Sequence, residues 1–207
     1  HKDTFVITTI EQHSSVQELV RNLKDIHTYK ICIGANEHLA ENFISKIIKA
    51  YRNSNCTNIF IIIPGVVPGF SVIFDQKILE NLKLQLIRLN IPHVFVLDDC
   101  QGALYVPRNY EMFDAITMTA DTLFIGFKMG ILFTKLKTPI GFINKTGLKR
   151  FGEKLLILAK HKDKALQFNS LLTEYFASNF NNVFQPLTGV TPQYFTLQVN
   201  GVNIPRE

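Results

Sequence analysis

The chain has 207 residues, of which 46% are hydrophobic and 19% are charged, and its formal net charge is +5. This composition excludes a disordered chain, and the length suits one substantial domain, or one domain with a fragment of a second. The longest apolar run, residues 59–74, contains two Pro-Gly pairs, which excludes a membrane-spanning helix in this run.

The basic residues indicate no nucleic-acid partner, and the cysteines indicate the cellular compartment. Lysines are densest in residues 145–164, where a helical pattern without interleaved aromatic residues indicates a solvated helix face and no nucleic-acid surface. The three cysteines have no metal-site spacing, and their odd number does not suit a disulfide framework. We therefore expect a reducing compartment and a cytoplasmic protein.

Short apolar runs alternate with helical patterns along the first hundred residues. Strands are predicted at residues 4–9, 29–34, 58–63, 94–97, 113–119, 130–134 and 194–201. Helices are predicted at residues 14–24, 37–52, 75–89 and 147–180, the last with an interruption near residues 160–163. Such alternation predicts right-handed crossovers, a parallel sheet and an α/β fold.

The C-terminal segment differs in composition from the rest of the chain. Residues 185–192 are rich in Pro and Thr and read as a linker, after which a strand of a different unit begins. We predict a large domain over residues 1–184, and a linker with the start of a second unit over residues 185–207. The chain begins with His1 next to a strand-like segment, so we expect it to be a piece of a longer polypeptide.

The segment HVFVLDDCQGA, residues 93–103, is the main candidate for a functional site. Its apolar half predicts a strand buried on both faces, because it does not alternate. Asp98, Asp99, Cys100 and Gln101 follow at the carboxyl end of that strand, where open α/β sheets bind their ligands. The alternative is an ordinary polar loop at a strand exit.

Several familiar catalytic motifs are absent from the sequence. It contains no Gly-rich dinucleotide fingerprint, no P-loop, no HExxH, no G-x-S-x-G and no paired-cysteine metal site. A thiol nucleophile at Cys100 is conceivable, but a lone cysteine at a strand end is more often a small buried hydrophobic residue.

Two segments resemble motifs of the fold type I pyridoxal-phosphate enzymes, specifically the class V aminotransferase and cysteine desulfurase group. IEQHSSV, residues 10–16, is similar to the segment whose histidine stacks on the cofactor ring, so the resemblance implies that role for His13. LDDCQ, residues 97–101, is similar to the strand end that carries the ring-binding carboxylate. The resemblance implies that Asp98 pairs with the pyridine nitrogen and that Gln101 lies near the ring hydroxyl.

This resemblance also implies a fold, a three-layer α-β-α sandwich with a mostly parallel sheet and one antiparallel strand. It implies a dimer, either of two copies or with a related subunit, whose cofactor lies at the subunit interface. We expect neither a nucleic acid nor a membrane as a partner.

The Schiff-base lysine of this family has no counterpart at the matching position. Residues 114–134 keep the family's order of strand, small polar residues, glycine-containing turn and strand, and they imply that Thr119 and Thr122 line the cofactor site. The lysine position itself falls on Thr122, and threonine has no amino group for a Schiff base. The nearest lysine is Lys128, six positions later, which makes it the candidate catalytic residue of an active enzyme.

Two further departures concern the rest of the cofactor site. The loop at residues 64–69 lacks the asparagine that many class V members place near the ring hydroxyl. The family's glycine-rich phosphate segment lies upstream of the histidine segment, and we expect this N-terminal portion of the domain to be missing from the chain.

Three functions remain open from the sequence. The first is a domain of this fold that has lost its lysine, holds no pyridoxal phosphate, and acts as a non-catalytic partner or scaffold. The second is an active enzyme of the desulfurase, aminotransferase or decarboxylase type that uses Lys128 or a lysine from elsewhere. The third is an unrelated α/β module that binds a small molecule, such as a nucleotide, or a metal ion, for which Asp98 and Asp99 would be the ligands. The sequence does not give the substrate.

Overall fold

The structure is a computed structural model of the whole chain. It describes residues 3–10, 12, 14–23, 26–31, 40–67, 72–100, 106, 108–119, 130–137, 145–181, 183–186 and 197–199.

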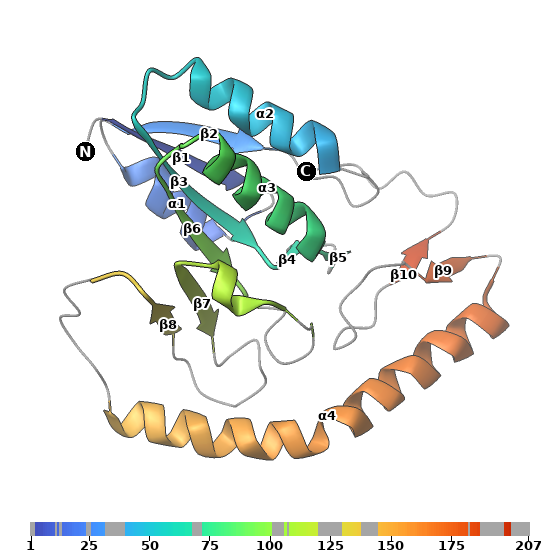
Figure 1. Cartoon of the computed structure of the whole chain (residues 1–207). Coiled ribbons are helices and arrows are strands. Elements are labelled where there is room, and N and C mark those ends of the chain that lie inside the picture. Colours follow the sequence, from blue (N-terminus) through green and yellow to red (C-terminus); the bar gives the residue numbers. More distant parts are fainter. Residues whose placement is uncertain are drawn as a thin grey trace.

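Six strands form one central sheet in the order β2-β1-β3-β6-β7-β8 (Figure 1). These strands are β1 (Thr4–Thr9), β2 (His27–Ile31), β3 (Asn58–Pro64), β6 (His93–Asp98), β7 (Ala115–Thr119) and β8 (Gly130–Thr134). All neighbouring strands run parallel except β7 and β8, which are antiparallel. The predicted parallel sheet with one antiparallel strand is confirmed.

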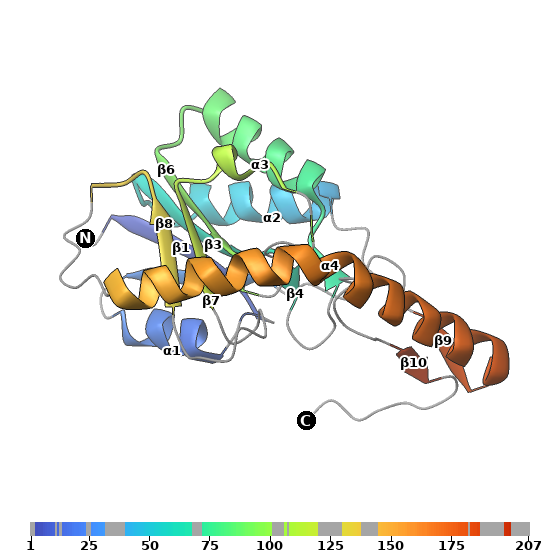
Figure 2. The ribbon, with the colours of Figure 1, turned by 90° about the horizontal axis from the view of Figure 1, so that it is seen from below.

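Helices cover both faces of this sheet and give three layers (Figures 1 and 2). Helices α2 (Ala40–Arg52) and α3 (Gln76–Arg88) lie on one face, and α1 (Ser14–Asn22) lies on the other. The α-β-α sandwich is therefore confirmed. The long helix α4 (Lys145–Asn179) lies on the β8 side of the sheet, and its far half extends beyond the sheet.

The main core lies between the sheet and helices α2 and α3. Ile61, Phe95 and Leu97 of the sheet are fully buried there, because β3 and β6 lie inside the sheet and carry apolar residues on both faces. The matching helix residues lie on one face of each helix, namely Phe43, Ile44 and Ile47 of α2 and Leu79, Leu82 and Leu86 of α3. A smaller cluster on the α1 face centres on Ile62, Val96 and Ala115.

Two differences from the sequence prediction are local. Residues 64–69 were expected to form a loop, but β4 (Val66–Val67) pairs with β5 (Val72–Ile73) as a short hairpin, closed by a 2.9 Å bond from the Phe74 amide to the Gly65 carbonyl. Helix α4 is continuous through residues 160–163, so the predicted interruption is wrong. That segment contains neither proline nor glycine, and polar residues alone do not break a helix.

The strand ends also differ in places. Strand β2 starts two residues earlier than predicted, and its predicted end at residues 32–34 is outside the described residues. Strand β7 starts two residues later than predicted, because the short 3-10 helix η1 (Tyr110–Met112) and Asp114 precede it. The Asp114 carboxylate accepts a 2.8 Å hydrogen bond from the Phe95 amide, which fixes the chain reversal.

The C-terminal segment contains a second, two-stranded sheet. Strand β9 (Phe184–Pro186) pairs antiparallel with β10 (Leu197–Val199), so part of the predicted linker is a strand. Among the helices that the structure describes, none combines the length and hydrophobicity needed to cross a membrane.

Candidate functional site

The carboxyl ends of the parallel strands meet at one edge of the sheet, and Asp98 lies in the middle of that edge. It is the last residue of β6, where it stands opposite Pro64 of β3 and Thr117 of β7. Backbone bonds on both sides fix this point, a 2.7 Å bond from the Gly65 amide to the Asp98 carbonyl and a 2.9 Å bond from the Asp99 amide to the Thr117 carbonyl. Asp98 is only 7% exposed, so this edge of the sheet holds a buried carboxylate.

Three donors satisfy the Asp98 carboxylate from different segments of the chain. Oδ1 accepts a 3.2 Å bond from the Thr117 hydroxyl and a 3.3 Å bond from the Cys100 amide. Oδ2 accepts a short hydrogen bond from the Gln12 side-chain amide, which follows β1 and is itself buried. These bonds offset the cost of burying the charge and fix the direction in which the carboxylate points.

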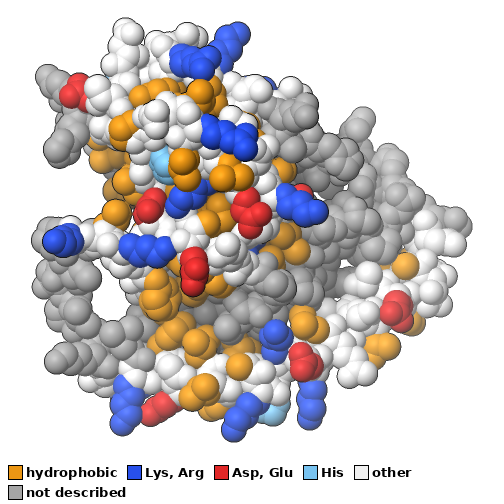
Figure 3. Space-filling view, in the orientation of Figure 1, with side chains coloured by type: hydrophobic (Ala, Val, Ile, Leu, Met, Phe, Trp, Pro, Cys, Tyr) orange, Lys and Arg blue, Asp and Glu red, His pale blue; other side chains and the backbone are white. Residues whose placement is uncertain are grey.

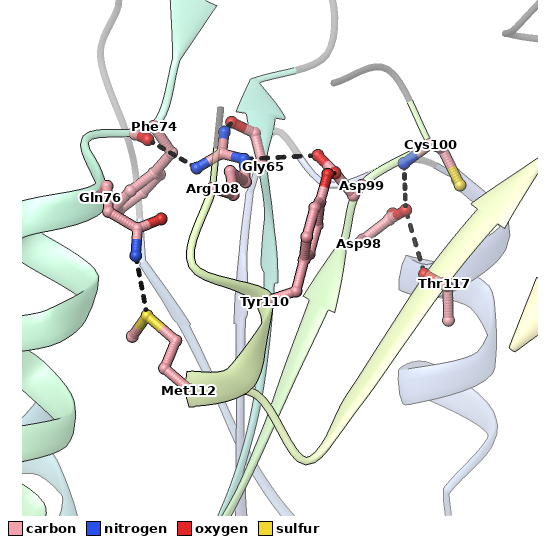
Figure 4. A network of polar contacts seen from close by, with 10 residues as sticks. All are labelled: Gly65, Phe74, Gln76, Asp98, Asp99, Cys100, Arg108, Tyr110, Met112 and Thr117. Carbon is pink, nitrogen blue, oxygen red and sulfur yellow. Dashed lines mark hydrogen bonds and ion pairs between the residues drawn. The ribbon is translucent and has the colours of Figure 1, made fainter. Parts of the chain in front are cut away.

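The next residue, Asp99, points to the other side, toward Arg108 and Tyr110 (Figure 4). The Tyr110 hydroxyl donates a 2.6 Å bond to Oδ2, and Arg108 Nε lies 3.5 Å from Oδ1 with both side chains fully buried. Burial raises the pKa of Asp99 to about 6, although Tyr110 and Arg108 both act in the opposite direction. Burial also lowers the pKa of Arg108 and raises that of Tyr110.

Arg108 contacts three segments of the chain near this edge of the sheet. Its guanidinium donates a 3.1 Å bond to the Phe74 carbonyl and a short bond to the Gly65 carbonyl, while its Nε faces Asp99. A Cβ on Gly65 would lie 2.5 Å from Asp99 Oδ1, so only glycine fits at this point. The β4–β5 hairpin is thus held against the end of β6.

The surroundings of Cys100 favour the thiol over the thiolate. Burial and the neighbouring Asp98 carboxylate raise the pKa of this thiol well above the usual range, and the Thr119 side chain hydrogen-bonds to it. A reactive cysteine needs a lowered pKa, so this environment favours the interpretation of Cys100 as a small, partly buried residue over that of a nucleophile.

Several buried polar atoms at the same edge have no hydrogen-bond partner among the described residues. They are the hydroxyls of Thr8 and Thr9, at the end of β1, and the Oε1 atom of Gln12. Buried polar atoms normally find a partner, so this part of the edge is suited to a polar ligand.

The structure brings two of the predicted site residues together, Asp98 and Thr119, which lie at the ends of adjacent strands with Cys100 beside both. His13, Gln101, Thr122 and Lys128 lie outside the described residues. The sequence interpretation missed Gln12, although it directly precedes His13, and Thr117, although it shares a strand face with Thr119. It also missed Arg108 and Tyr110, which no motif marks.

The two acidic residues do not form a metal site in the structure. Asp98 and Asp99 turn toward different partners, and Asp99 faces a buried arginine. Nowhere in the described ranges do three or more His, Cys, Asp or Glu side chains gather in a group able to hold a metal ion.

Comparison with solved structures identifies the fold. The chain is similar to a NifS-like protein from Rickettsia africae (TM-score 0.67, 12% identity, 93% of this chain and 57% of that one). It is similar to the glutamate decarboxylase domain of a transaminase and decarboxylase from Vibrio parahaemolyticus (TM-score 0.66, 11% identity, 99% and 47%). It is also similar to a variant of C-DES with glycine covalently linked to its pyridoxal-phosphate cofactor (TM-score 0.65, 12% identity, 93% and 60%).

The chain has the fold of a fold type I pyridoxal-phosphate-dependent transferase. It spans about half the length of the solved structures it matches. No protein-family model matches the sequence, and no curated protein matches it. This likeness shows the fold, so the fold assumed in the third possibility above, an unrelated α/β module, is not the one observed. The fold alone does not give the function, which is argued from the residues.

Proposed function

We propose that this domain is a non-catalytic member of the transferase-like fold, acting as a partner or scaffold. Thr122 occupies the position where the resemblance puts the Schiff-base lysine, and no lysine occurs between Lys83 and Lys128. A hydroxyl side chain cannot replace the amino group in that covalent bond. The amino group that would form the covalent bond to the cofactor is therefore missing from its usual position.

The observation that carries this proposal is the short bond between Gln12 and Asp98. In the family the equivalent carboxylate faces the pyridine nitrogen, which donates a hydrogen bond to it. Here the Gln12 amide donates to Asp98 Oδ2, while Oδ1 already accepts from Thr117 and Cys100. The carboxylate is thus stabilised by the protein itself, which is what a domain without cofactor needs in order to keep a buried charge.

The edge nevertheless fits the ring end of the cofactor in part. Asp98 is buried, and the unpartnered hydroxyls of Thr8 and Thr9 lie at the same edge of the sheet. If pyridoxal phosphate were bound, Asp98 would hold the ring nitrogen, with His13 over the ring and Gln101, Thr119 and Thr122 around it. When bound, the cofactor supplies an electron sink, which a nearby carboxylate strengthens by keeping the ring nitrogen protonated.

We further propose that the domain pairs with a second copy of itself or with a related catalytic subunit. The resemblance implies a dimer, and a non-catalytic domain exerts its effect through such a partner.

The test is a trapping experiment with pyridoxal phosphate. The purified chain, mixed with the cofactor and then treated with borohydride, is digested and analysed by mass spectrometry for modified lysines. We expect no site-specific adduct on the wild-type chain. The Thr122→Lys variant restores an amino group at the family position and is expected to gain an adduct on residue 122, together with a visible absorbance band.

The active-enzyme alternative makes the opposite prediction. A trapped adduct on Lys128 in the wild-type chain, lost in Lys128→Ala, would overturn the proposal and assign that lysine to catalysis. Lys135→Ala is the matched control, because Lys135 is an exposed lysine just beyond β8 and its loss should change nothing.

A further inference from the structure

A second candidate site lies far from Asp98, in a cavity of about 670 Å³ between helices α2 and α3. The two helices lie side by side on one face of the sheet (Figure 1). The wall from α2 includes Ile48, Lys49 and Arg52, and the opposite wall includes Asn81 and Gln85 of α3 and its C-cap residue Leu89. The volume is in the range of pockets that bind small organic molecules, about 300–1,000 Å³.

The charge of this cavity is one-sided. Lys49 and Arg52 are three positions apart on α2, so they project from the same side of the helix. Among the described residues, the cavity lining contains no acidic side chain, and neither cation has a carboxylate within ion-pair distance. Two cations on one wall, without an acidic partner in the described ranges, suit a negatively charged group such as a phosphate or carboxylate.

The opposite wall supplies different chemistry. Asn81 and Gln85 are four positions apart on α3, and neither side chain has a hydrogen-bond partner among the described residues. Side-chain amides both donate and accept, so they suit hydroxyl, amide or ring-nitrogen groups. Ile48 and Leu89 add apolar surface, and Figure 3 shows hydrophobic and basic side chains close together on this face.

Cations in the last turn of a helix also offset the negative end of its dipole, and Lys49 and Arg52 occupy such positions in α2. Stabilisation of the helix dipole requires neither a cavity nor side-chain amides on the facing helix. The cavity and the amides of Asn81 and Gln85 are both present, so helix stabilisation alone does not account for this arrangement.

We propose that this cavity binds a small organic anion, with its phosphate or carboxylate on Lys49 and Arg52 and its uncharged part against Asn81, Gln85 and Leu89. The helix ends at this cavity lead into the beginnings of β3 and β6, whereas Asp98 lies at the carboxyl end of β6. The two sites therefore lie at opposite edges of the sheet, and the proposal is independent of whether the domain binds pyridoxal phosphate.

The test is a titration of the isotope-labelled chain followed by NMR, with adenosine monophosphate, decanoate and inorganic phosphate as probes. We expect one of the two organic anions to shift the backbone amides of residues 44–53 and 81–89, and inorganic phosphate to shift them more weakly at equal concentration. The double variant Lys49→Gln with Arg52→Gln should weaken binding at least about tenfold, since it removes two charge-assisted hydrogen bonds.

The matched control is the double variant Lys46→Gln with Arg88→Gln. It removes the same charge from exposed positions of the same two helices outside the cavity lining, and it should leave binding unchanged. Equal weakening in both double variants would overturn the proposal, as would the absence of shifts in both segments with all three probes. Equal binding of inorganic phosphate would overturn the assignment of an organic anion. Adenosine monophosphate and decanoate separate a phosphate head with a planar ring from a carboxylate head with an aliphatic chain.

Discussion

The two adjacent carboxylates at the end of β6 have different surroundings, and this difference sets their roles. Asp98 accepts bonds from an amide side chain, a hydroxyl and a backbone amide, whereas Asp99 faces Arg108 and Tyr110. Arg108 Nε and Asp99 Oδ1 lie 3.5 Å apart without forming a hydrogen bond, so the charge on Asp99 is incompletely offset. Burial therefore opposes the ionisation of Asp99, because its charge is less well compensated than that of Asp98.

The first prediction concerns the pH dependence of stability in Asp99→Asn. The folded pKa of Asp99 is about 6, above its ordinary value of 3.8, so between these values the folded chain binds a proton that the unfolded chain does not. Compared with Asp99→Asn, the wild-type chain should therefore lose up to about 3 kcal/mol of unfolding free energy as the pH rises from 4 to 7. Urea unfolding of both proteins at intervals across this range measures the difference, and parallel profiles would contradict the assignment.

The second prediction is the effect of a methyl group at Gly65. The added Cβ would lie 2.5 Å from Asp99 Oδ1 and within 3.3 Å of two Arg108 nitrogens, so Gly65→Ala must displace the buried pair. We expect a loss of about 2 to 4 kcal/mol in the free energy of unfolding. Gly152→Ala is the control, because nothing lies within 4 Å of its added Cβ and alanine favours α4 by up to about 1 kcal/mol. The packing argument would be refuted if Gly65→Ala and Gly152→Ala changed the free energy of unfolding equally, or if Gly65→Ala caused no loss.

At the scale of single elements, α3 offers a direct test of helix capping. Asp75 has extended backbone angles, and its carboxylate accepts a 2.8 Å bond from the Lys77 amide. The third prediction is that Asp75→Ala lowers the free energy of unfolding by about 1 kcal/mol, while Asp75→Asn, which keeps the acceptor oxygen, costs much less. Thermal or urea unfolding of the two variants measures this difference. Equal losses of unfolding free energy in Asp75→Ala and Asp75→Asn would show that the capping hydrogen bond contributes nothing.

The elements that the sequence predicted well are those with strong periodicity or a clear cap. The apolar spacing of α3 and its Asp75 cap predicted both ends of that helix, and the unbroken apolar run of residues 59–63 predicted β3. The β4–β5 hairpin was missed because two residues per strand leave no periodic pattern, and its pairing depends on the Phe74–Gly65 bond and on Arg108.

The candidate site was predictable only where its residues end a strand. Asp98 and Thr119 follow from the rule that parallel strands bring their carboxyl ends together. Gln12 contacts Asp98 across 86 residues of sequence, and Arg108 contacts Gly65 across 43. Such contacts join residues far apart in the sequence, and neither residue type nor spacing encodes which of them meet in the fold.

At the scale of the whole molecule, the long helix α4 stands apart from the core of the domain. Its far half extends beyond the sheet (Figure 2), and nearly all of its described residues are exposed or half-buried.

Four exposed apolar side chains lie on one side of α4 and form what we call the apolar stripe. Ile157, Phe168, Leu171 and Tyr175 lie within about 60° of one another around the helix axis at 100° per residue, and each is more than half exposed. The exposed Lys164 lies on the same side between Ile157 and Phe168, so the stripe is uninterrupted only from Phe168 to Tyr175. Exposed apolar side chains grouped in this way are a candidate interaction surface. We take a second copy of the chain as its partner, because a two-fold axis would pair the stripe with itself.

The fourth prediction is therefore that the chain dimerises through this stripe. Sedimentation velocity should show a concentration-dependent dimer for the wild-type chain, and Phe168→Glu with Leu171→Glu should shift it to monomer, since two carboxylates in an apolar interface lose their hydration. Ala159→Glu with Ser170→Glu adds the same charge on the opposite side of α4, where both positions are exposed, and should leave the dimer intact. A wild-type chain that stays monomeric at every concentration would rule out the homodimer and leave the related subunit as the partner to seek, whereas dissociation by both double variants would point to charge rather than to the stripe.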